Sequence, residues 1–533
     1  MSLRYWFLSF LLITPALIPY LTHYFIGIDG LVPTGFIHED WVYYMANGRE
    51  FFDEGFHLSY GNPFGPSYDM PRIYFQPLML LLGTVWRVTG WDPGVVFVLV
   101  GFVAAVVCAR VAIALYREVI GLESWAQRLG LVTFFWGGGV LAIAGFVYNV
   151  VTHEPLIRVF RFEPEAGWWF LNFGRNLILP TEATYHALFF ACILFVLRNQ
   201  YRAAALFALL LSISHPFTGL ELLMILCVWS FVEVFLARGT NVPRGFLYTC
   251  CLLVALHVGY YLVFLNRFPE HRIVVEQWAQ PWVLRPQNFI PAYLIVGALA
   301  FLELRRIDRL HAFLALPRNR LFLLWFLVVF LLANHQIFIR PVQPVHFERG
   351  YIWTALFLIG GQQLIRLFAG LTRRRFGVLG MILFVAVFLS DNALWLGVFP
   401  VRTFKGIRLT EDQASLLNWM NSKENNGSVI LAQHNLIGYL APVYTSLRAW
   451  WCHPYITPYA KQRWDEQKSL FVEDKFLQQW DSLRLLVVFV GAMPDERKPQ
   501  WLIDRAAERV WQSSSYTVFR INPRSAASEA FIK

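Results

Sequence analysis

The stretch "GVVFVLVGFVAAVVCARVAIALY", residues 94–116, decides the class of the fold. It contains one charged residue, Arg110, and is long enough for the about 20 mainly apolar residues that cross a bilayer. Similar stretches begin and end the first four hundred residues, at 5–25 and 376–399. The chain is 57% hydrophobic, 15% charged and has a mean hydropathy of +0.47, whereas soluble proteins carry about 25% charged residues. The sequence therefore predicts an α-helical polytopic membrane protein.

The arginines between the apolar runs assign the sides of the membrane. They cluster in four short segments: "RNQYR" (198–202), "ARGTNVPRG" (237–245), "LRRIDRLHAFLALPRNR" (304–320) and "TRRRF" (372–376). Such clusters mark cytoplasmic loops, so they account for the net charge of +10 without nucleic acid as a partner. The opposite, outward set comprises residues 26–72, about 150–182, 266–290, 339–349 and everything after about 400.

The apolar segment 73–90 breaks this alternation if it is counted as a span, because Arg117 and Arg128 would then face out. Its polar residues fall near one helical face, the pattern of a helix that lies in the membrane interface. Leaving it out gives about eleven transmembrane helices, the first an uncleaved anchor with its N-terminus in the cytoplasm. They are expected at 4–25, 94–115, 129–149, 183–198, 203–217, 219–236, 246–265, 289–304, 320–338, 350–368 and 377–398.

Hydropathy falls from Val401 onward, so we expect a transmembrane domain at 1–400 and a small outward-facing α/β domain at 401–533. The domain opens with a helix whose Thr410 and Gln413 form a capping box. Strands are expected at "SVILA" (428–432), "LRLLVVFV" (483–490) and "SYTVFRI" (515–521), with a helix at "PQWLIDRAAERVW" (499–511). Within the transmembrane domain, the first outward loop, 26–93, holds the juxtamembrane helices.

Two adjacent acids, Glu39 and Asp40, lie in that loop within "GFIHEDWVYYMANGREF", residues 35–51. The chain after Asp40 has the pattern of an amphipathic helix at the outer interface. Asp40 would then lie at the helix start and face an aqueous cleft, where a carboxylate can act as a base. The alternative is that Asp40 only caps the helix. Tyr43 and Tyr44, on the same helix, are candidates for substrate binding.

Basic residues in other outward segments are candidates for ligand contacts. Arg340, His346 and Arg349 lie in "IRPVQPVHFERGY" (339–351), where arginine forks could bind a lipid phosphate; the alternative is snorkelling at the interface. Further possible substrate-binding residues are Arg158, Arg175 and His186, in or next to the loop 150–182, and Arg448 and His453 in the C-terminal domain. No nucleotide-binding, zinc-protease or disulfide motif is evident.

The chain resembles the GT-C class of membrane glycosyltransferases, on an outward loop after the first span that opens with "HEDWVYY" (38–44), in-plane helices, further spans and an outward α/β domain. It is similar to the group of protein O-mannosyltransferases, lipid A aminoarabinose transferases and oligosaccharyltransferase catalytic subunits. The resemblance implies that Asp40 is the catalytic base, with Glu39 as assistant or alternative. The WWDYG motif of oligosaccharyltransferases is absent, the nearest string being "AWWCHP" (449–454), so asparagine glycosylation is not implied.

The resemblance also implies a polyprenyl-phosphate sugar donor. We therefore expect an inverting glycosyltransferase of a bacterial inner membrane, whose acceptor is a lipid, a glycan or a protein on the extracytoplasmic side. A divalent metal is compatible with this chemistry, and the sequence defines no ligand set for one. The main alternative is a lipid or glycan transporter or flippase, which would place ionisable groups within its spans. A non-enzymatic membrane scaffold ranks after it, because it leaves the acid pair unexplained.

Overall fold

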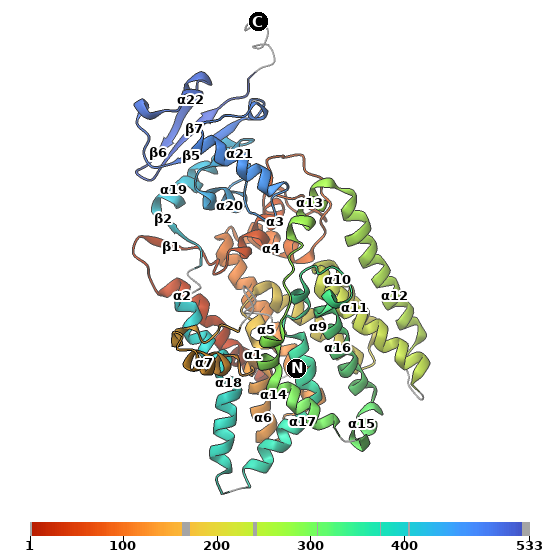
Figure 1. Cartoon of the computed structure of the whole chain (residues 1–533). Coiled ribbons are helices and arrows are strands. Elements are labelled where there is room, and N and C mark those ends of the chain that lie inside the picture. Colours follow the sequence, from red (N-terminus) through yellow and green to blue (C-terminus); the bar gives the residue numbers. More distant parts are fainter. Residues whose placement is uncertain are drawn as a thin grey trace. The chain divides into compact units, whose positions relative to one another are not determined.

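The computed structural model describes residues 3–162, 171–237, 242–305, 307–373, 375–402 and 406–524 (Figure 1). They form two compact units, which are described separately. The helical unit comprises residues 1–22, 98–261 and 280–404, and the mixed unit comprises residues 23–97, 262–279 and 405–533. The first loop therefore folds with the C-terminal part of the chain, although almost all of the helical unit lies between them in the sequence.

The helical unit consists of the apolar runs found in the sequence. Its main helices are α1 (Leu3–Ile13), α2 (Ile18–Phe25), α5 (Pro93–Val119), α6 (Trp125–Trp136), α7 (Leu141–Val151), α8 (Phe173–Asn176), α9 (Pro180–Leu197), α10 (Tyr201–Ser214), α11 (Pro216–Phe231), α12 (Arg244–Val258), α14 (Pro286–Leu304), α15 (Ile307–Leu314), α16 (Pro317–Ala333), α17 (Tyr351–Leu371) and α18 (Gly377–Arg402). Short helical turns join some of them: η1 (Thr14–Leu17), η2 (Leu156–Arg158), η3 (Val232–Leu236), η4 (Gly259–Phe264), η6 (His335–Ile337) and η7 (Pro344–Phe347). Helix α17 packs against both α14 and α16.

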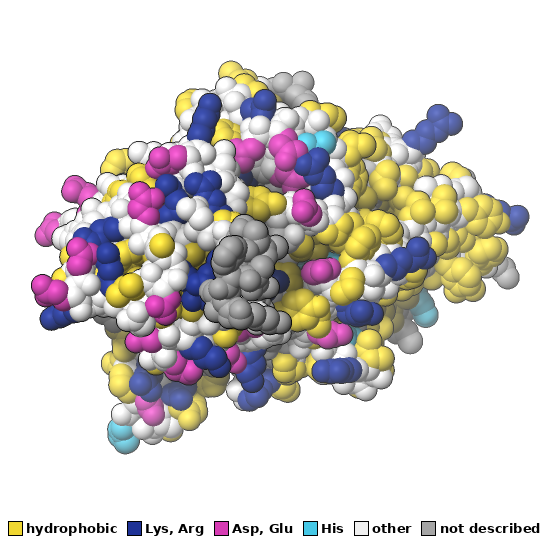
Figure 2. Space-filling view, turned by 90° about the horizontal axis from the view of Figure 1, so that it is seen from above, with side chains coloured by type: hydrophobic (Ala, Val, Ile, Leu, Met, Phe, Trp, Pro, Cys, Tyr) yellow, Lys and Arg dark blue, Asp and Glu magenta, His cyan; other side chains and the backbone are white. Residues whose placement is uncertain are grey.

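The membrane class is confirmed by the lengths of these helices. In the described part, eight helical stretches are long and apolar enough to cross a bilayer, and α6 with α7 adds a ninth if this pair, bent by 63°, is one span. The predicted count of eleven is not confirmed, because α10 and α16 have only 14 and 17 residues, fewer than the about 20 of a full span. Exposed apolar side chains such as Leu252 and Leu256 cover α12, and Figure 2 shows a hydrophobic surface over that part of the molecule.

The bend between α6 and α7 follows from three consecutive glycines, 137–139. A broken helix leaves backbone N–H groups without partners, which is costly inside a bilayer. The carboxylate of Asp391 accepts hydrogen bonds from the N–H groups of Gly139, Leu141 and Ala142 at 2.9–3.0 Å. A buried acid thus caps the start of α7 and fixes the bend.

The mixed unit combines the first loop, a short helix and the C-terminal domain. Its helices are α3 (Asp40–Glu54), α4 (Pro77–Thr89), α13 (Pro269–Trp278), α19 (Glu411–Met420), α20 (Asn435–Tyr444), α21 (Ala460–Val472) and α22 (Gln500–Asp504), with short turns η5 (Leu265–Arg267), η8 (Lys423–Asn425), η9 (Gln478–Trp480) and η10 (Asp495–Arg497). The expected capping box of Thr410 and Gln413 is present at α19. With 13 residues, α4 is about 20 Å long, too short to cross the about 30 Å hydrocarbon core.

The strands of the mixed unit are β1 (Leu31–Pro33), β2 (Arg408–Thr410), β3 (Val429–Ala432), β4 (Arg448–Ala449), β5 (Leu485–Val490), β6 (Glu508–Gln512) and β7 (Tyr516–Ile521). An antiparallel ladder of β1 and β2 joins the first loop to the C-terminal domain. The other five form one sheet in the order β4-β3-β5-β7-β6, parallel at β4, β3 and β5 and antiparallel at β7 and β6. The predicted strands at 428–432, 483–490 and 515–521 are confirmed.

The helix predicted at 499–511 is wrong in its second half. It ends at Asp504, the chain turns at Ala506 with φ of 49°, and β6 begins at Glu508. Pairing of this segment with β7 satisfies its backbone groups and outweighs the local helix preference.

Close contact between α3 and α4 depends on Gly48 and Gly83. A Cβ atom added at Gly83 would lie 2.3 Å from the carbonyl oxygen of Gly48 and 2.6 Å from Cβ of Phe51. We expect Gly83→Ala to lower the free energy of unfolding by about 1–3 kcal/mol, because the two helices must separate. Thermal unfolding in detergent measures this. Gly245→Ala, where an added Cβ meets no atom within 4 Å, is the control; equal unfolding temperatures for both variants would contradict the prediction.

Candidate active site

The acid pair lies at the start of α3, as predicted, and neither acid caps the helix. The helix begins at Asp40, and Glu39 in the N-cap position has a helical backbone and makes no side-chain capping bond. Among the described residues, no backbone N–H of α3 donates to either carboxylate. Both residues are exposed, the side chain of Asp40 to 62%. The capping alternative therefore does not explain the pair, and both carboxylates face solvent with free lone pairs.

His38 contacts the acid pair without neutralising it. Its Nδ1 accepts a hydrogen bond from the backbone N–H of Asp40 at 3.2 Å, and the same atom lies 3.4 Å from Oδ2 of Asp40. A ring nitrogen that accepts carries no proton, so it cannot donate to the carboxylate. Through this nitrogen His38 therefore donates no hydrogen bond to Asp40.

The C-terminal domain brings Tyr439 of α20 and the loop residue His453 close to the acids. The hydroxyl of Tyr439 donates to the backbone carbonyl of Glu39 at 2.7 Å, and the rings of Tyr439 and His453 are 5.1 Å apart. Burial, and then the charges of Asp40 and Glu39, raises the pKa of Tyr439 well above its usual value. Asp40, Glu39, His453 and Tyr439 thus form one cluster within the mixed unit.

His453 is held as a neutral ring. Burial lowers the pKa of His453, and the nearby charge of Asp40 opposes this effect. Its Nδ1 accepts a hydrogen bond from the backbone N–H of Tyr455 at 3.2 Å, so the neutral ring carries its proton on Nε2. His453 therefore offers a hydrogen-bond donor beside a charged, exposed carboxylate.

Aromatic rings line the helix next to the acids. Tyr43 stacks on Phe64 with centroids 5.5 Å apart and planes at 11°, and it meets Trp278 of α13 edge-on at 6.3 Å. Tyr44 stacks on Phe97 at 6.0 Å. Both tyrosines are half-buried, so they pack next to the acids and keep part of each side chain exposed.

Arg448 lies elsewhere in the mixed unit. Its guanidinium donates to the backbone carbonyl of Asn62 at 3.3 Å and lies over the ring of Tyr68. Burial lowers the pKa of this guanidinium. These contacts join β4 to the first loop, and the structure shows no hydrogen bond or ion pair between Arg448 and the acid pair among the described residues.

The three residues predicted to bind phosphate differ in their surroundings, all within the helical unit. Arg340 is exposed, after η6, and forms no ion pair in the described part of the chain. Arg349 is 4% exposed, forms an ion pair with Glu182 of α9, and hydrogen-bonds to Nδ1 of His346. The ring of His346 stacks on Phe217 at 4.9 Å. Arg349 and His346 are thus engaged by protein groups, and Arg340 presents its charge to solvent.

The remaining candidates also contact the protein. Arg158 forms an exposed ion pair with Glu154 at 3.2 Å. Arg175 is fully buried and donates to the side chain of Asn392 at 2.8 Å. His186 is fully buried, with its Nε2 2.8 Å from the carbonyl oxygen of Arg349. These contacts of the three residues are therefore all with other groups of the protein.

Several ionisable residues that sequence reasoning did not assign are buried in the helical unit. Glu182, Glu221 and Glu348 are each at most 1% exposed, and Glu348 hydrogen-bonds to the hydroxyl of Tyr293. Glu182 and Glu348 belong to segments that the sequence assigns to the outward side, whereas Glu221 lies inside an apolar run. An acid inside an apolar run was the available signal, because such residues are rare in membrane helices.

Comparison with solved structures identifies the fold. The chain is similar to the crystal structure of the Archaeoglobus fulgidus oligosaccharyltransferase tethered with an acceptor peptide containing the NVT sequon. The TM-score is 0.50 at 11% identity, over 92% of this chain and 69% of that chain. ArnT from Cupriavidus metallidurans, in the apo state and bound to undecaprenyl phosphate, gives TM-scores of 0.46 at 12% and 11% identity, over 98% of this chain and 100% of ArnT.

No protein-family model and no curated protein matches the sequence. The similarity to the oligosaccharyltransferase shows that the chain has the GT-C fold, and it confirms the fold class expected from the sequence. At this level of identity a shared fold carries no residue role, so the site must be argued from its own geometry.

Proposed function

We propose that this chain is an inverting glycosyltransferase that moves a sugar from a polyprenyl-phosphate donor to an acceptor at the extracytoplasmic face of the membrane. The observation that carries the proposal is the acid pair on a GT-C fold. The two adjacent carboxylates are exposed, form no capping bond to the helix, and lie next to the neutral imidazole of His453. A carboxylate with free lone pairs beside polar neighbours is suited to general-base catalysis.

The proposed reaction is a single displacement at the anomeric carbon. Asp40 accepts the proton of the acceptor nucleophile, whose electron pair forms the new bond to the anomeric carbon. The bond from that carbon to the phosphate oxygen breaks at the same time, and its electron pair leaves with the polyprenyl phosphate. Attack opposite the leaving group inverts the configuration. Glu39 assists Asp40 or replaces it as the base, and His453 hydrogen-bonds to the acceptor or the sugar through Nε2.

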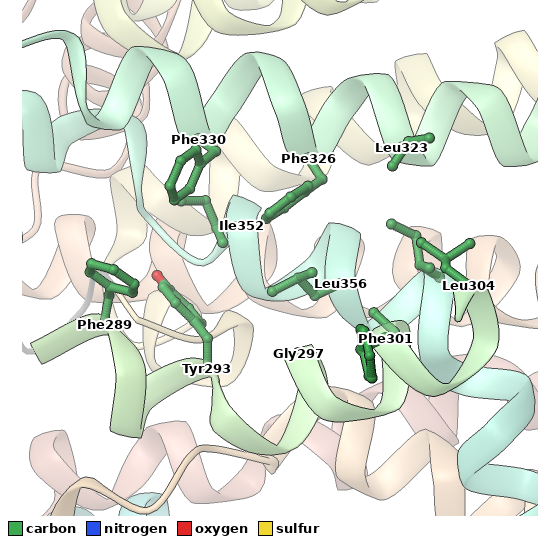
Figure 3. Close-up of a pocket in the computed structure, with 12 residues that line it drawn as sticks. Phe289, Tyr293, Gly297, Phe301, Leu304, Leu323, Phe326, Phe330, Ile352 and Leu356 are labelled. Carbon is green, nitrogen blue, oxygen red and sulfur yellow. The ribbon is translucent and has the colours of Figure 1, made fainter. Parts of the chain in front are cut away.

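An apolar pocket in the helical unit supports a lipid donor. It has a volume of about 330 Å³ and lies among α14, α16 and α17, within the about 300–1,000 Å³ of ligand pockets. Figure 3 shows side chains of α14 and α16 facing one another across it, with Ile352 and Leu356 of α17 between them. The hydroxyl of Tyr293 donates a hydrogen bond to Glu348. The pocket walls therefore present only hydrocarbon surface to an isoprenoid chain.

Arg340 is suited to the phosphate of the same lipid. Phe330, at one end of the pocket, lies in the last turn of α16, and the chain continues from there through η6 to Arg340. An exposed guanidinium can form two parallel hydrogen bonds to phosphate oxygens and stabilise the negative charge of the leaving group. We therefore assign the donor phosphate to Arg340, with Arg349 and His346 shaping the segment that follows.

Lipid analysis of a deletion strain tests the proposal. We expect cells without this chain to accumulate one polyprenyl-phosphate sugar and to lose that sugar from one envelope glycan, lipid or protein, as measured by mass spectrometry. Complementation with the wild-type chain should reverse both changes. Unchanged lipid-linked sugars together with unchanged envelope sugars would contradict the proposed function.

A transporter is the second candidate, and the buried acids Glu182, Glu221 and Glu348 favour it, because ionisable groups within spans often mark translocation paths. A transporter also fits an accumulated donor lipid, so the two functions need a separate test. In liposomes, a flippase moves a labelled polyprenyl-phosphate lipid between leaflets, whereas the proposed enzyme does not. Leaflet exchange by the wild type that is lost in Glu221→Gln, with no sugar transfer, would favour the transporter.

A further inference from the structure

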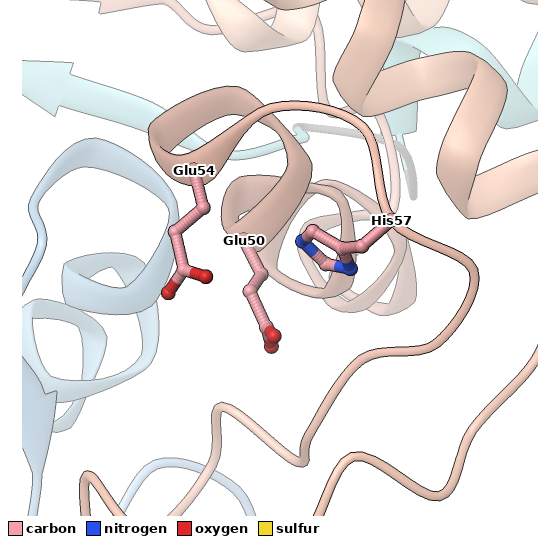
Figure 4. Close-up of side chains that lie close together, drawn as sticks. All are labelled: Glu50, Glu54 and His57. Carbon is pink, nitrogen blue, oxygen red and sulfur yellow. The ribbon is translucent and has the colours of Figure 1, made fainter.

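A second cluster of chemically active side chains lies at the other end of α3. Glu50 and Glu54 are one helical turn apart, and His57 follows in the next loop. Their potential ligand atoms, one from each residue, all lie within 4.8 Å of one another. Figure 4 shows the two carboxylates and the imidazole ring grouped on one side of the helix end. Two carboxylates and one imidazole form a donor set typical of divalent transition metals.

The hydrogen bonds of His57 prepare one nitrogen for a ligand. Its Nδ1 lies 2.6 Å from the backbone carbonyl oxygen of Ser59, and because a carbonyl can only accept, Nδ1 carries the proton. Nε2 then has a free lone pair, and it is buried without a hydrogen-bond partner in the described structure. The ring is held by stacking on Phe51 at 4.5 Å. Histidine ligands of metal ions usually have this arrangement, with the other nitrogen bound to a carbonyl.

Arg72 contacts both carboxylates. Its Nε lies 2.5 Å from Oε1 of Glu50, and its Nη2 contacts Oε2 of Glu54. The second oxygen of Glu50 accepts from the backbone N–H of Gly61 at 2.9 Å, which fixes that carboxylate. The side chain of Arg72 is 47% exposed, so it can turn toward solvent. A guanidinium in this position compensates the two negative charges and competes with a cation for them.

We propose that Glu50, Glu54 and His57 bind one divalent transition-metal ion of the Zn²⁺ type, with water completing the coordination, and that Arg72 competes with the ion. Glu50 lies ten residues after Asp40 on the same helix, about 15 Å along the axis, so the ion does not reach the acid pair. Its role is structural, and the proposal does not depend on the proposed function.

The ion would fix a loop that reaches the C-terminal domain. This loop follows α3, and within the mixed unit Tyr68 donates to the carbonyl of Ser428 at 2.7 Å and Asn62 to the carbonyl of Ile456 at 3.4 Å. A ligand bond from His57 to the two helix glutamates ties the start of this loop to α3. Metal removal should therefore loosen the attachment of the loop, with a lower unfolding temperature.

Metal binding to the purified full-length chain in detergent tests the proposal. The protein is stripped with a chelator, dialysed against ZnCl₂ and analysed for zinc by mass spectrometry, and the affinity is measured by competition with a chromophoric chelator. We expect one zinc per chain, a loss of about tenfold or more in affinity for His57→Ala and for Glu54→Gln, and a gain for Arg72→Ala. His153→Ala, at an exposed histidine of the helical unit, is the matched control.

The variants separate a metal site from a simple ion-pair cluster. If Arg72 only balances the glutamates, Arg72→Ala lowers the unfolding temperature and zinc does not restore it. If Arg72 competes with a metal, zinc raises the unfolding temperature of Arg72→Ala more than that of the wild type. Glu54 is half exposed, so Glu54→Gln should fold even where His57→Ala does not. Absence of stoichiometric zinc in the wild type, or equal affinity in Glu54→Gln, would overturn the proposal.

Discussion

Asp40→Asn is expected to reduce sugar transfer by about 10²–10⁴-fold, the usual contribution of a general base. Asparagine has nearly the same shape as aspartate but cannot accept the proton of the nucleophile. The carboxylate of Asp40 is 62% exposed and makes no capping bond, so its loss should leave folding almost unchanged. Product formation by the purified chain, with thermal unfolding measured on the same sample, tests both parts.

Glu39→Gln is the matched control for this prediction, because it removes the neighbouring carboxylate at the same exposed site. We expect it to keep activity within about tenfold of the wild type, as an assisting group would. The opposite result, with Asp40→Asn active and Glu39→Gln inactive, would exchange the roles of the two acids. Wild-type activity in both variants and in their combination would remove the acid pair from the mechanism.

Arg349→Met is expected to lower the free energy of unfolding by about 3–5 kcal/mol, because it leaves the carboxylate of Glu182 buried without its ion-pair partner. Both side chains are almost completely buried, at 5% and 2% exposure. A second change, Glu182→Gln, removes the unpaired charge, so the double variant should regain most of the lost stability. Unfolding in one detergent, followed by tryptophan fluorescence, provides the comparison.

Arg158→Met is the control for this second prediction. It breaks an exposed ion pair with Glu154, which lies four residues earlier in the sequence. Such surface ion pairs contribute about 0–1 kcal/mol to stability. A loss in Arg349→Met no larger than that in Arg158→Met would show that the buried pair does not stabilise the bundle. The same result would return Arg349 to the candidates for the donor phosphate.

The membrane class and three strands of the C-terminal sheet could be predicted because they depend on local patterns, and the GT-C fold was expected from a resemblance of architecture to that class. Long apolar runs indicate spans, and the capping box at Thr410 is read within four residues. The number of spans was harder to predict, since α10 and α16 are apolar but short. Residues 508–512 form a strand only because β7 is there to pair with them.

The part of the candidate site formed by neighbouring residues could be predicted from the sequence. The part assembled from residues far apart in the sequence could not. Glu39 and Asp40 are adjacent and head a helix, so their pattern indicates a function. Tyr439 reaches Glu39 from 400 residues away, and no periodicity in the sequence connects them. The ion pair of Arg349 with Glu182 is of the same kind, because it depends on the packing of α9 against the segment before α17.

The most direct test of the proposed function is a transfer reaction with the purified chain in detergent, where no membrane separates two compartments. The donor is the polyprenyl-phosphate sugar that accumulates in the deletion strain, and mass spectrometry follows the acceptor and the released lipid together. We predict one polyprenyl phosphate released for each sugar gained by the acceptor, at a rate that depends on Asp40. An unchanged donor and acceptor, with the chain folded and the donor bound, would contradict the account.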